Sequence, residues 1–116
     1  MPQQILIVED NANIRLAMTT YLKMKGYEPL EAESIETAQA VIQAKSPAAI
    51  ISDINLPDGK GDQLLHHTDV PVIAMTGHVD DATRERLLSE GFAAFLPKPA
   101  TLDQLMETLD SVMKHA

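Results

Sequence analysis

The feature that most constrains the fold is a regular alternation between short aliphatic runs and stretches with helical spacing. The strand-like runs are Ile5–Val8, Tyr27–Ala32, Ala48–Ser52, Val72–Met75 and Ala93–Leu96. This alternation predicts βαβ units around a parallel sheet, because a parallel strand pair needs a crossover that a helix usually supplies. We therefore expect a doubly wound α/β fold with right-handed crossovers and helices on both faces of the sheet. No linker or repeat divides the chain, so residues 1–116 are expected to form a single domain.

The segments between these runs contain the expected helices. Asn11 or Asn13 is suited to cap the first helix, and Ser34 is suited to cap the second. Thr101 and Gln104 match a capping box at the start of the last helix. Apolar residues with helical spacing are Ile14, Ala17, Met18, Tyr21 and Leu22 in the first helix and, in a thinner stripe, Ala82, Leu87 and Leu88 in the fourth.

The second strand is expected at an edge of the sheet. It contains Pro29, and proline donates no hydrogen bond to a strand ladder. The pattern alone does not give the order of the other strands.

The overall composition excludes several classes of protein. The chain of 116 residues is 45% hydrophobic, which is enough for a buried core, and it has no Cys for a disulfide scaffold, a thiolate metal site or a Cys nucleophile. Its 17 acidic and 9 basic residues give a net charge of -8, which argues against direct binding to nucleic acid or to an anionic membrane. The chain has no apolar run of the roughly 20 residues that a membrane span needs, and it does not begin with a signal-peptide pattern. We expect a cytoplasmic protein.

Polar residues follow four of the predicted strands at the point where each strand ends. Glu9 and Asp10 follow the first, Asp53 the third, Thr76 the fourth, and Lys98 comes within two residues of the fifth. The carboxyl ends of parallel strands share one edge of a sheet, and ligands of open α/β sheets bind there. We therefore expect these five side chains to converge.

This set of side chains is suited to phosphoryl chemistry with a divalent cation. Three carboxylates in one crevice repel one another, and Mg²⁺, which prefers oxygen ligands, would relieve that repulsion. Asp10 and Asp53 would bind the ion directly, Glu9 would act through water, and the backbone carbonyl of Asn55 would add another oxygen. Asp53 is also the best candidate for a nucleophile that forms an acyl phosphate.

The remaining groups would assist that chemistry. Lys98 would neutralise charge on the phosphoryl oxygens, and Thr76 would donate a hydrogen bond to one of them. Each residue alone also fits an ordinary role: Glu9 or Asp10 as a helix cap, Lys98 as a solvated lysine and Phe95 as a core aromatic. Their joint occurrence in the right elements and order favours a functional site.

Four segments in order resemble the receiver domain of two-component response regulators. They are ILIVEDN, IISDINLPDGKG, VIAMTGH and GFAAFLPKP, and the resemblance covers essentially all 116 residues. It implies a flavodoxin-like (βα)5 fold whose five-stranded parallel sheet has the order 2-1-3-4-5. It also implies that Asp53 accepts a phosphoryl group from a histidine of a sensor kinase or a histidine phosphotransfer protein.

The resemblance assigns further roles to residues of the same segments. Glu9 and Asp10 match the acidic pair that, with Asp53 and the Asn55 carbonyl, binds Mg²⁺ or, in its place, Mn²⁺. Thr76 matches the switch hydroxyl and Lys98 the phosphate-binding lysine. Separately, Phe95 matches the aromatic that changes rotamer on activation, and Lys98-Pro99 matches a bond that is usually cis.

In this family, phosphorylation alters a face made by the fourth helix, the fifth strand and the fifth helix. That face would control an output domain or a downstream protein, and a phosphorylation-dependent homodimer is left open. The protein would not be an enzyme beyond its own phosphorylation and dephosphorylation. Neither nucleic acid nor a membrane is expected as a direct partner, and a bacterial-type cytoplasmic setting follows from the resemblance.

Two other functions are weighed against this one. An Asp-nucleophile phosphohydrolase usually has a second Asp two residues after the nucleophile, where this chain has Asn55. A receiver-like interaction module that acts without phosphate is the other alternative.

The sequence departs from the family pattern at several positions. The segment from Asp62 to Val70 is short, which predicts a truncated third helix, and Ala100 replaces a larger apolar residue. In the family, the residues two after the acceptor and two after the switch hydroxyl tune dephosphorylation, and here they are Asn55 and His78. Three other histidines are expected on the surface, with no third ligand that would indicate zinc: His66, His67 and His115.

Overall fold

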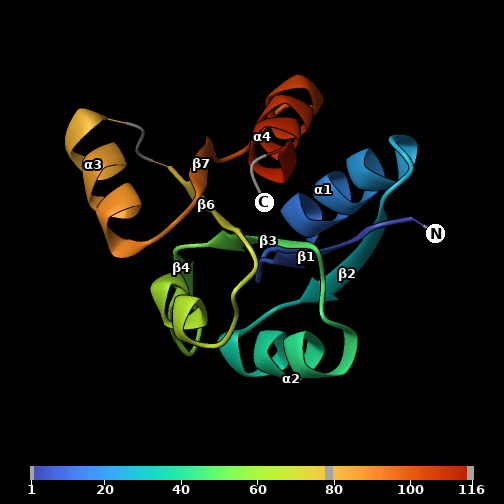
Figure 1. Ribbon diagram of the computed structural model, residues 1–116, viewed down its shortest axis with the longest axis horizontal. Coiled ribbons are helices and arrows are strands. Elements are labelled where there is room, and N and C mark those ends of the chain that lie inside the picture. Colours follow the sequence, from blue (N-terminus) through green and yellow to red (C-terminus); the bar gives the residue numbers. More distant parts are fainter. Residues whose placement is uncertain (1, 78–79, 115–116) are drawn as a thin grey trace.

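The structure, a computed structural model, describes residues 2–77 and 80–114. Its centre is a five-stranded parallel sheet in the order β2-β1-β3-β6-β7 (Figure 1). The strands are β1 (Gln4–Val8), β2 (Glu28–Ala32), β3 (Ala49–Asp53), β6 (Val72–Thr76) and β7 (Ala94–Pro97). Counted along the chain within this sheet, the order is 2-1-3-4-5, which confirms the predicted fold. Pro29 lies in the edge strand β2, also as predicted.

Helices cover both faces of this sheet (Figure 1). They are α1 (Ala12–Met24), α2 (Ile35–Lys45), α3 (Asp81–Glu90) and α4 (Leu102–Lys114), together with a 3₁₀ helix, η1 (Gly61–His66). Helices α1 and α4 pack on one face, while α2, η1 and α3 pack on the other. The third helical element is therefore a short 3₁₀ helix, which agrees with the predicted truncation.

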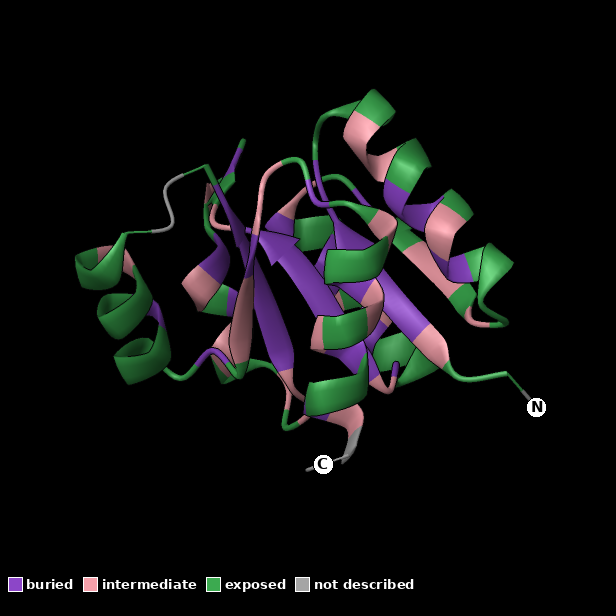
Figure 2. Cartoon of the chain, turned by 90° about the horizontal axis from the view of Figure 1, so that it is seen from above, coloured by how far each residue is buried: buried purple, intermediate pink, exposed green. Residues whose placement is uncertain are grey.

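Two hydrophobic cores result from the alternation of side chains along the strands. On β1, Ile5 and Ile7 point into the core under α1 and α4, whereas Leu6 and Val8 point into the core over α2. All four are completely buried, and the strands form the buried layer between exposed helix surfaces in Figure 2. Each such side chain contributes about 1.5–3 kcal/mol. The central strands are thus rigid supports for whatever follows them at their carboxyl ends.

The predicted helix caps are present. Asn11 Oδ1 accepts from two backbone N–H groups of the first turn of α1, and Ser34 and Thr37 form a capping box on α2. At α4, Thr101 N donates to Gln104 Oε1 at 2.9 Å, and Gln104 N donates to Thr101 Oγ1 at 3.1 Å. These bonds satisfy donors that helix starts otherwise leave open.

Three residues predicted to lie on apolar helix stripes are exposed instead. Ala17 on α1 faces solvent, and on α3 only Leu87 of the predicted stripe is buried, since Ala82 and Leu88 are exposed. Helix α3 packs beside β7, the outermost strand, so only a narrow strip of it reaches the core. Ala100, in contrast, is buried in the core under α4.

A small antiparallel hairpin follows β3. It pairs β4 (Asn55–Leu56) with β5 (Gly59–Lys60) around a turn at Pro57 and Asp58. The hairpin leads directly into η1.

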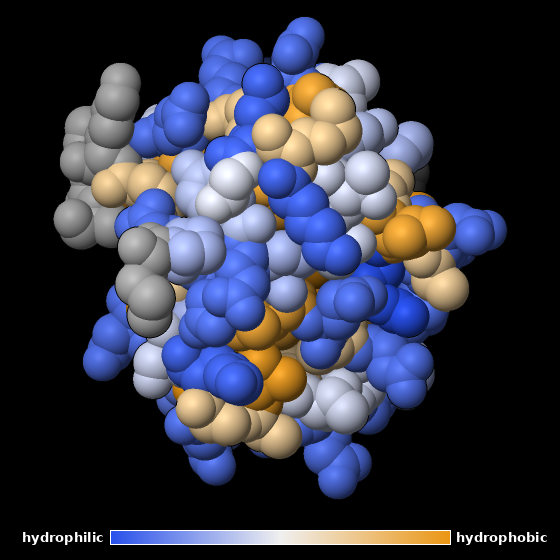
Figure 3. Space-filling model, turned by 90° about the vertical axis from the view of Figure 1, so that its right-hand side faces the viewer, coloured by the Kyte–Doolittle hydropathy of each residue, from blue (hydrophilic) through white to orange (hydrophobic). Residues whose placement is uncertain are grey.

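No helix within residues 2–77 and 80–114 combines the length and apolar character needed to cross a membrane. The face on the β2 side of the molecule is largely hydrophilic, with separate apolar patches (Figure 3).

Candidate functional site

Glu9, Asp10, Asp53 and Lys98 converge at the carboxyl edge of the sheet. One carboxylate oxygen from each of Glu9, Asp10 and Asp53 lies within 4.8 Å of the other two. Lys98 Nζ lies 2.6 Å from Asp53 Oδ2 and 3.1 Å from Glu9 Oε1. The strand ends bring these residues together because β1, β3 and β7 all run in the same direction.

Glu9 is held rigidly at the end of β1. Its backbone N–H donates to Ala32 O at 3.0 Å, and its Oε1 accepts from Asn11 N at 3.0 Å. Its side chain is completely buried. Burial raises the pKa of Glu9, and the nearby Asp53 charge adds to that rise, while hydrogen bonds from Asn11 and Lys98 oppose it.

Asp53 is the last residue of β3 and is almost completely buried. Its Oδ2 accepts from Lys98, and its Oδ1 accepts from Asn55 N at 3.2 Å. Gly61 packs directly against the Asp53 backbone carbonyl, where a Cβ would clash with the oxygen. A carboxylate held in this way can act as a nucleophile toward an electrophile.

Lys98 provides the positive charge of the site. Burial alone would lower the pKa of Lys98, but hydrogen bonds to Asp53 and Glu9 and the attraction of both charges outweigh burial and raise it. The ammonium therefore stays charged at neutral pH. The Lys98-Pro99 peptide bond is cis.

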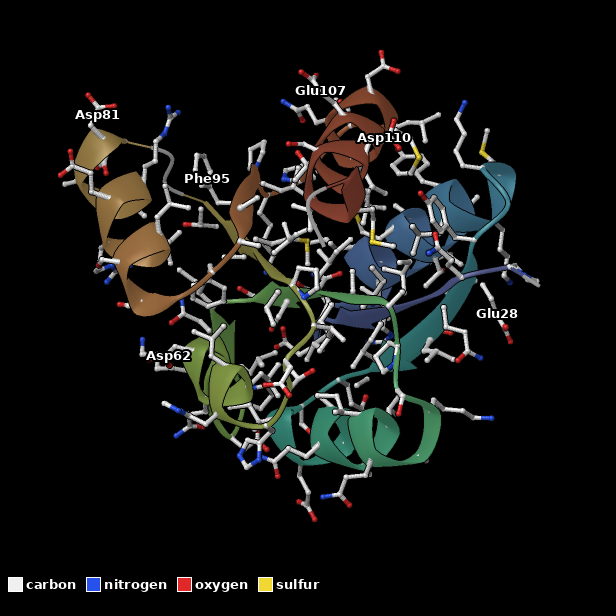
Figure 4. The ribbon with its side chains drawn as sticks, viewed as in Figure 1. Glu28, Asp62, Asp81, Phe95, Glu107 and Asp110 are labelled. Carbon is white, nitrogen blue, oxygen red and sulfur yellow. The ribbon has the colours of Figure 1, made fainter. Side chains whose placement is uncertain are left out.

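Thr76 lies on β6, the strand next to that of Asp53, and Phe95 lies on β7, one strand further out. Thr76 is buried at the end of β6, whose Met75 pairs in register with Asp53 of β3. Phe95 lies on β7, between α3 and α4, and is half-buried against the core of the α2 face (Figure 4). The Arg84 guanidinium of α3 lies 4.8 Å from the centroid of the Phe95 ring.

The donor set of this edge fits a hard divalent cation. Every candidate ligand atom in the cluster is a carboxylate oxygen. One further oxygen, Glu9 Oε2, is buried without a hydrogen-bond partner among the described residues. A buried carboxylate oxygen without a partner is costly, and a water molecule bound to a cation would satisfy it.

Other residues near the site carried no sequence signal. Arg15 Nη1 donates to Glu9 O at 2.7 Å, Ser52 Oγ donates to Asp53 O at 2.9 Å, and Lys60 Nζ donates to Asn55 Oδ1 at 2.7 Å. The fold brings the partners of these bonds together, and no periodic pattern in the sequence predicts them.

The histidines take no described part in the site. His66 and His67 are exposed at the end of η1, as predicted. His78 and His115 lie outside the described residues.

A family model described as the response regulator receiver domain matches residues 5–110, and the chain belongs to this family. The chain is 31% identical over 122 residues to the phosphate regulon transcriptional regulatory protein PhoB of Escherichia coli (strain K12), covering 99% of this chain and 53% of PhoB. It is 33% identical over 118 residues to PhoB of Pseudomonas aeruginosa, covering 96% of this chain and 52% of that protein. The chain thus spans about half the length of the curated relatives it matches.

Solved structures agree with this assignment. The chemotaxis response regulator CheY4 of Vibrio cholerae matches with a TM-score of 0.87 and 25% identity, covering 97% of this chain and 99% of CheY4. The family belongs to two-component systems and serves phosphorelay signalling, typically without enzyme activity of its own. Its receivers are phosphorylated by histidine kinases, bind Mg²⁺ at an acidic pocket and are often attached to output domains.

Proposed function

We propose that this chain is a phospho-accepting signalling switch in which Asp53 takes a phosphoryl group from a histidine. The observation that supports this most strongly is the placement of the Asp53 carboxylate between the Lys98 ammonium and two further carboxylates. The donor would be a sensor histidine kinase or a histidine phosphotransfer protein, acting in the cytoplasm. The receiver unit is proposed to extend over residues 1–116, somewhat beyond the matched range.

The transfer step uses the Asp53 carboxylate as nucleophile. One carboxylate oxygen attacks phosphorus, the P–N bond to the donor imidazole breaks, and its electron pair stays on the imidazole nitrogen, which takes up a proton. Lys98 offsets the negative charge that the phosphoryl oxygens bring into the crevice. Thr76, buried on the neighbouring strand, would donate a hydrogen bond from its hydroxyl to one of those oxygens.

Asp10, Asp53 and the Asn55 backbone carbonyl would hold Mg²⁺ directly, and Glu9 would contact the ion through water. When bound, the ion neutralises carboxylate and phosphoryl charge. Mn²⁺ would substitute because it also accepts oxygen ligands. The proposed ligands would already be in position before the phosphohistidine donor binds.

The consequence of phosphorylation would be a shift between two existing states. Thr76 would move toward the phosphoryl group, and Phe95 would occupy the space it leaves. Helix α3, strand β7 and helix α4 would respond, because Phe95 lies between the two helices (Figure 4). Helix α3 has only Leu87 buried, which is compatible with a loosely held element. This face would control an output domain or a downstream protein.

Phosphorylation by acetyl phosphate tests the proposal. With Mg²⁺ present, intact-mass analysis should show one added phosphoryl group on the wild-type protein and none on Asp53→Asn. Asp110→Asn, which removes an exposed carboxylate on α4, is the matched control and should accept the group normally. An adduct on Asp53→Asn, or none on the wild-type protein, would overturn the assignment.

A further inference from the structure

The side chain of Lys60 bonds to Asn55, two residues after the proposed acceptor. Lys60 Nζ donates to Asn55 Oδ1 over 2.7 Å. The two residues are register partners in the β4–β5 hairpin. Both are exposed, so burial does not fix their side chains, and this bond is what defines their relative arrangement.

The hairpin that presents this pair is anchored at two points. In its turn, Asp58 accepts from the backbone N–H groups of Ile35 and Glu36 at 2.9 and 3.0 Å. At its base, Gly61 N donates to Ile54 O at 3.0 Å. The backbone on either side of the Lys60–Asn55 bond is therefore held in place.

The bond also fixes which way the Asn55 amide faces. An ammonium group has only donors, so the atom that faces Lys60 must be the amide oxygen. A charged donor binds that oxygen more strongly than a neutral one such as water. Asn55 therefore presents an NH₂ donor to its other neighbours, while Lys60 takes one of the two acceptor positions of its oxygen.

The acceptor position that Lys60 takes matters for hydrolysis of an aspartyl phosphate. In that step, a water oxygen attacks phosphorus and the P–O bond to the Asp53 carboxylate breaks, returning its electron pair to the carboxylate. The proton that water loses ends on the released inorganic phosphate. A nearby acceptor accelerates the step when it holds the attacking water by its O–H group.

Water has access to Asn55. Lys60 and Asn55 both line a cavity of about 230 Å³ between the hairpin and α3. Without Lys60, both acceptor positions of the Asn55 oxygen would be open to water molecules.

We infer that Lys60 is a positioning residue that competes with the attacking water for the Asn55 oxygen and so prolongs the life of the phosphoryl group on Asp53. This inference rests on the proposed function of Asp53. It assigns Lys60 a role in the rate of signal decay, separate from the transfer step.

The test compares the dephosphorylation rates of five variants after acetyl phosphate is removed, counting Asn55→Ala alone as the reference for its double variant. Lys60→Met keeps the length of the side chain and removes its donors, and dephosphorylation should accelerate about two- to tenfold, the range expected for one hydrogen bond. Lys60→Arg keeps a charged donor and should stay close to wild type. In an Asn55→Ala background, which retains the backbone carbonyl, Lys60→Met should have no effect. Lys45→Met is the control for net charge, since Lys45 ends α2 at the opposite edge of the sheet.

A second measurement examines the bond without phosphate. The Asn55 side-chain amide resonances in ¹H–¹⁵N spectra should shift in Lys60→Met and remain near their wild-type positions in Lys60→Arg. An unchanged or slower dephosphorylation of Lys60→Met, or equal acceleration in the Asn55→Ala background, would overturn this inference alone. Absence of any adduct on the wild-type protein would overturn the proposed function and the inference with it.

Discussion

The ammonium of Lys98, in the segment after β7, lies 2.6 Å from Oδ2 of Asp53 at the end of β3. The same ammonium lies 3.1 Å from Oε1 of Glu9, which is completely buried. One cation therefore compensates two carboxylates that the sheet forces together. The carboxylates therefore repel one another before any ligand binds, and a change to any charge of the site should alter the stability of the protein measurably.

Replacement of Lys98 by Met should destabilise the protein by about 1–3 kcal/mol at neutral pH, because the buried Glu9 loses a charged hydrogen-bond donor. The fold raises the pKa of Glu9, so protonation of Glu9 favours the folded state and removes the uncompensated charge. The difference between Lys98→Met and wild type should therefore shrink as the pH falls through the pKa of Glu9. Thermal unfolding followed by circular dichroism between pH 4 and 8 measures this. A pH-independent difference would contradict it, and Lys23→Met on α1 is the control.

Replacement of Asp10 by Asn should stabilise the protein when no divalent cation is present. Asp10 is exposed, and its carboxylate lies within 4.8 Å of those of Glu9 and Asp53, so its removal relieves repulsion by about 1 kcal/mol or less. Mg²⁺ should raise the unfolding temperature of the wild-type protein. At a concentration one hundred times its dissociation constant, it should add about 2.7 kcal/mol to the free energy of unfolding.

The same variant should lose most of that response to Mg²⁺, since it lacks a proposed direct ligand. Thermal unfolding with and without Mg²⁺ provides both readouts, and Asp69→Asn, an exposed loop change, is the control. An undiminished Mg²⁺ response in Asp10→Asn would remove Asp10 from the ligand set.

The sequence predicted the main sheet because its strands are aliphatic and its turns are polar. Pro29 identified the edge strand, and Asn11, Ser34 and Thr101 marked helix starts whose side-chain bonds are present. The apolar stripe of α3 was overestimated. A helix beside the outermost strand buries only a narrow strip, and the helical period does not tell how much of a stripe reaches the core.

The rule that parallel strands share their carboxyl edge was enough to predict the convergence of Asp53 with Glu9 and Lys98. It did not predict Arg15 or Lys60, which bond to a backbone carbonyl and to a side-chain amide. Such bonds depend on where a loop or helix start places a long flexible side chain. No residue spacing encodes that placement, so only the folded structure reveals it.

Replacement of Asp58 by Asn should lower the unfolding temperature at neutral pH. The carboxylate accepts from the N–H groups of Ile35 and Glu36, and these bonds hold the pKa of Asp58 below its usual value of 3.8. A lowered pKa means that the stabilisation is present above pH 3.8 and is lost as the pH falls through the lowered value. Wild type and variant should therefore converge in strong acid. Asp110→Asn, an exposed change on α4, is the control variant, and a constant difference for Asp58→Asn would contradict the prediction.

Replacement of Arg84 by Gln should release the ring of Phe95. The guanidinium lies 4.8 Å from the ring centroid, an arrangement worth about 0.5–1 kcal/mol at an exposed site. If movement of Phe95 accompanies phosphorylation, this contact opposes the movement, and its loss should raise the population of the moved state about two- to fivefold. Amide shifts of α3 and β7 in unphosphorylated Arg84→Gln should then move part of the way toward those of the phosphorylated wild-type protein.

Arg86→Gln, on the same helix but paired with Glu90 at 3.9 Å, should leave the Phe95 resonances in place. Equal shifts in both variants would show that the Arg84 contact does not specifically restrain the Phe95 ring.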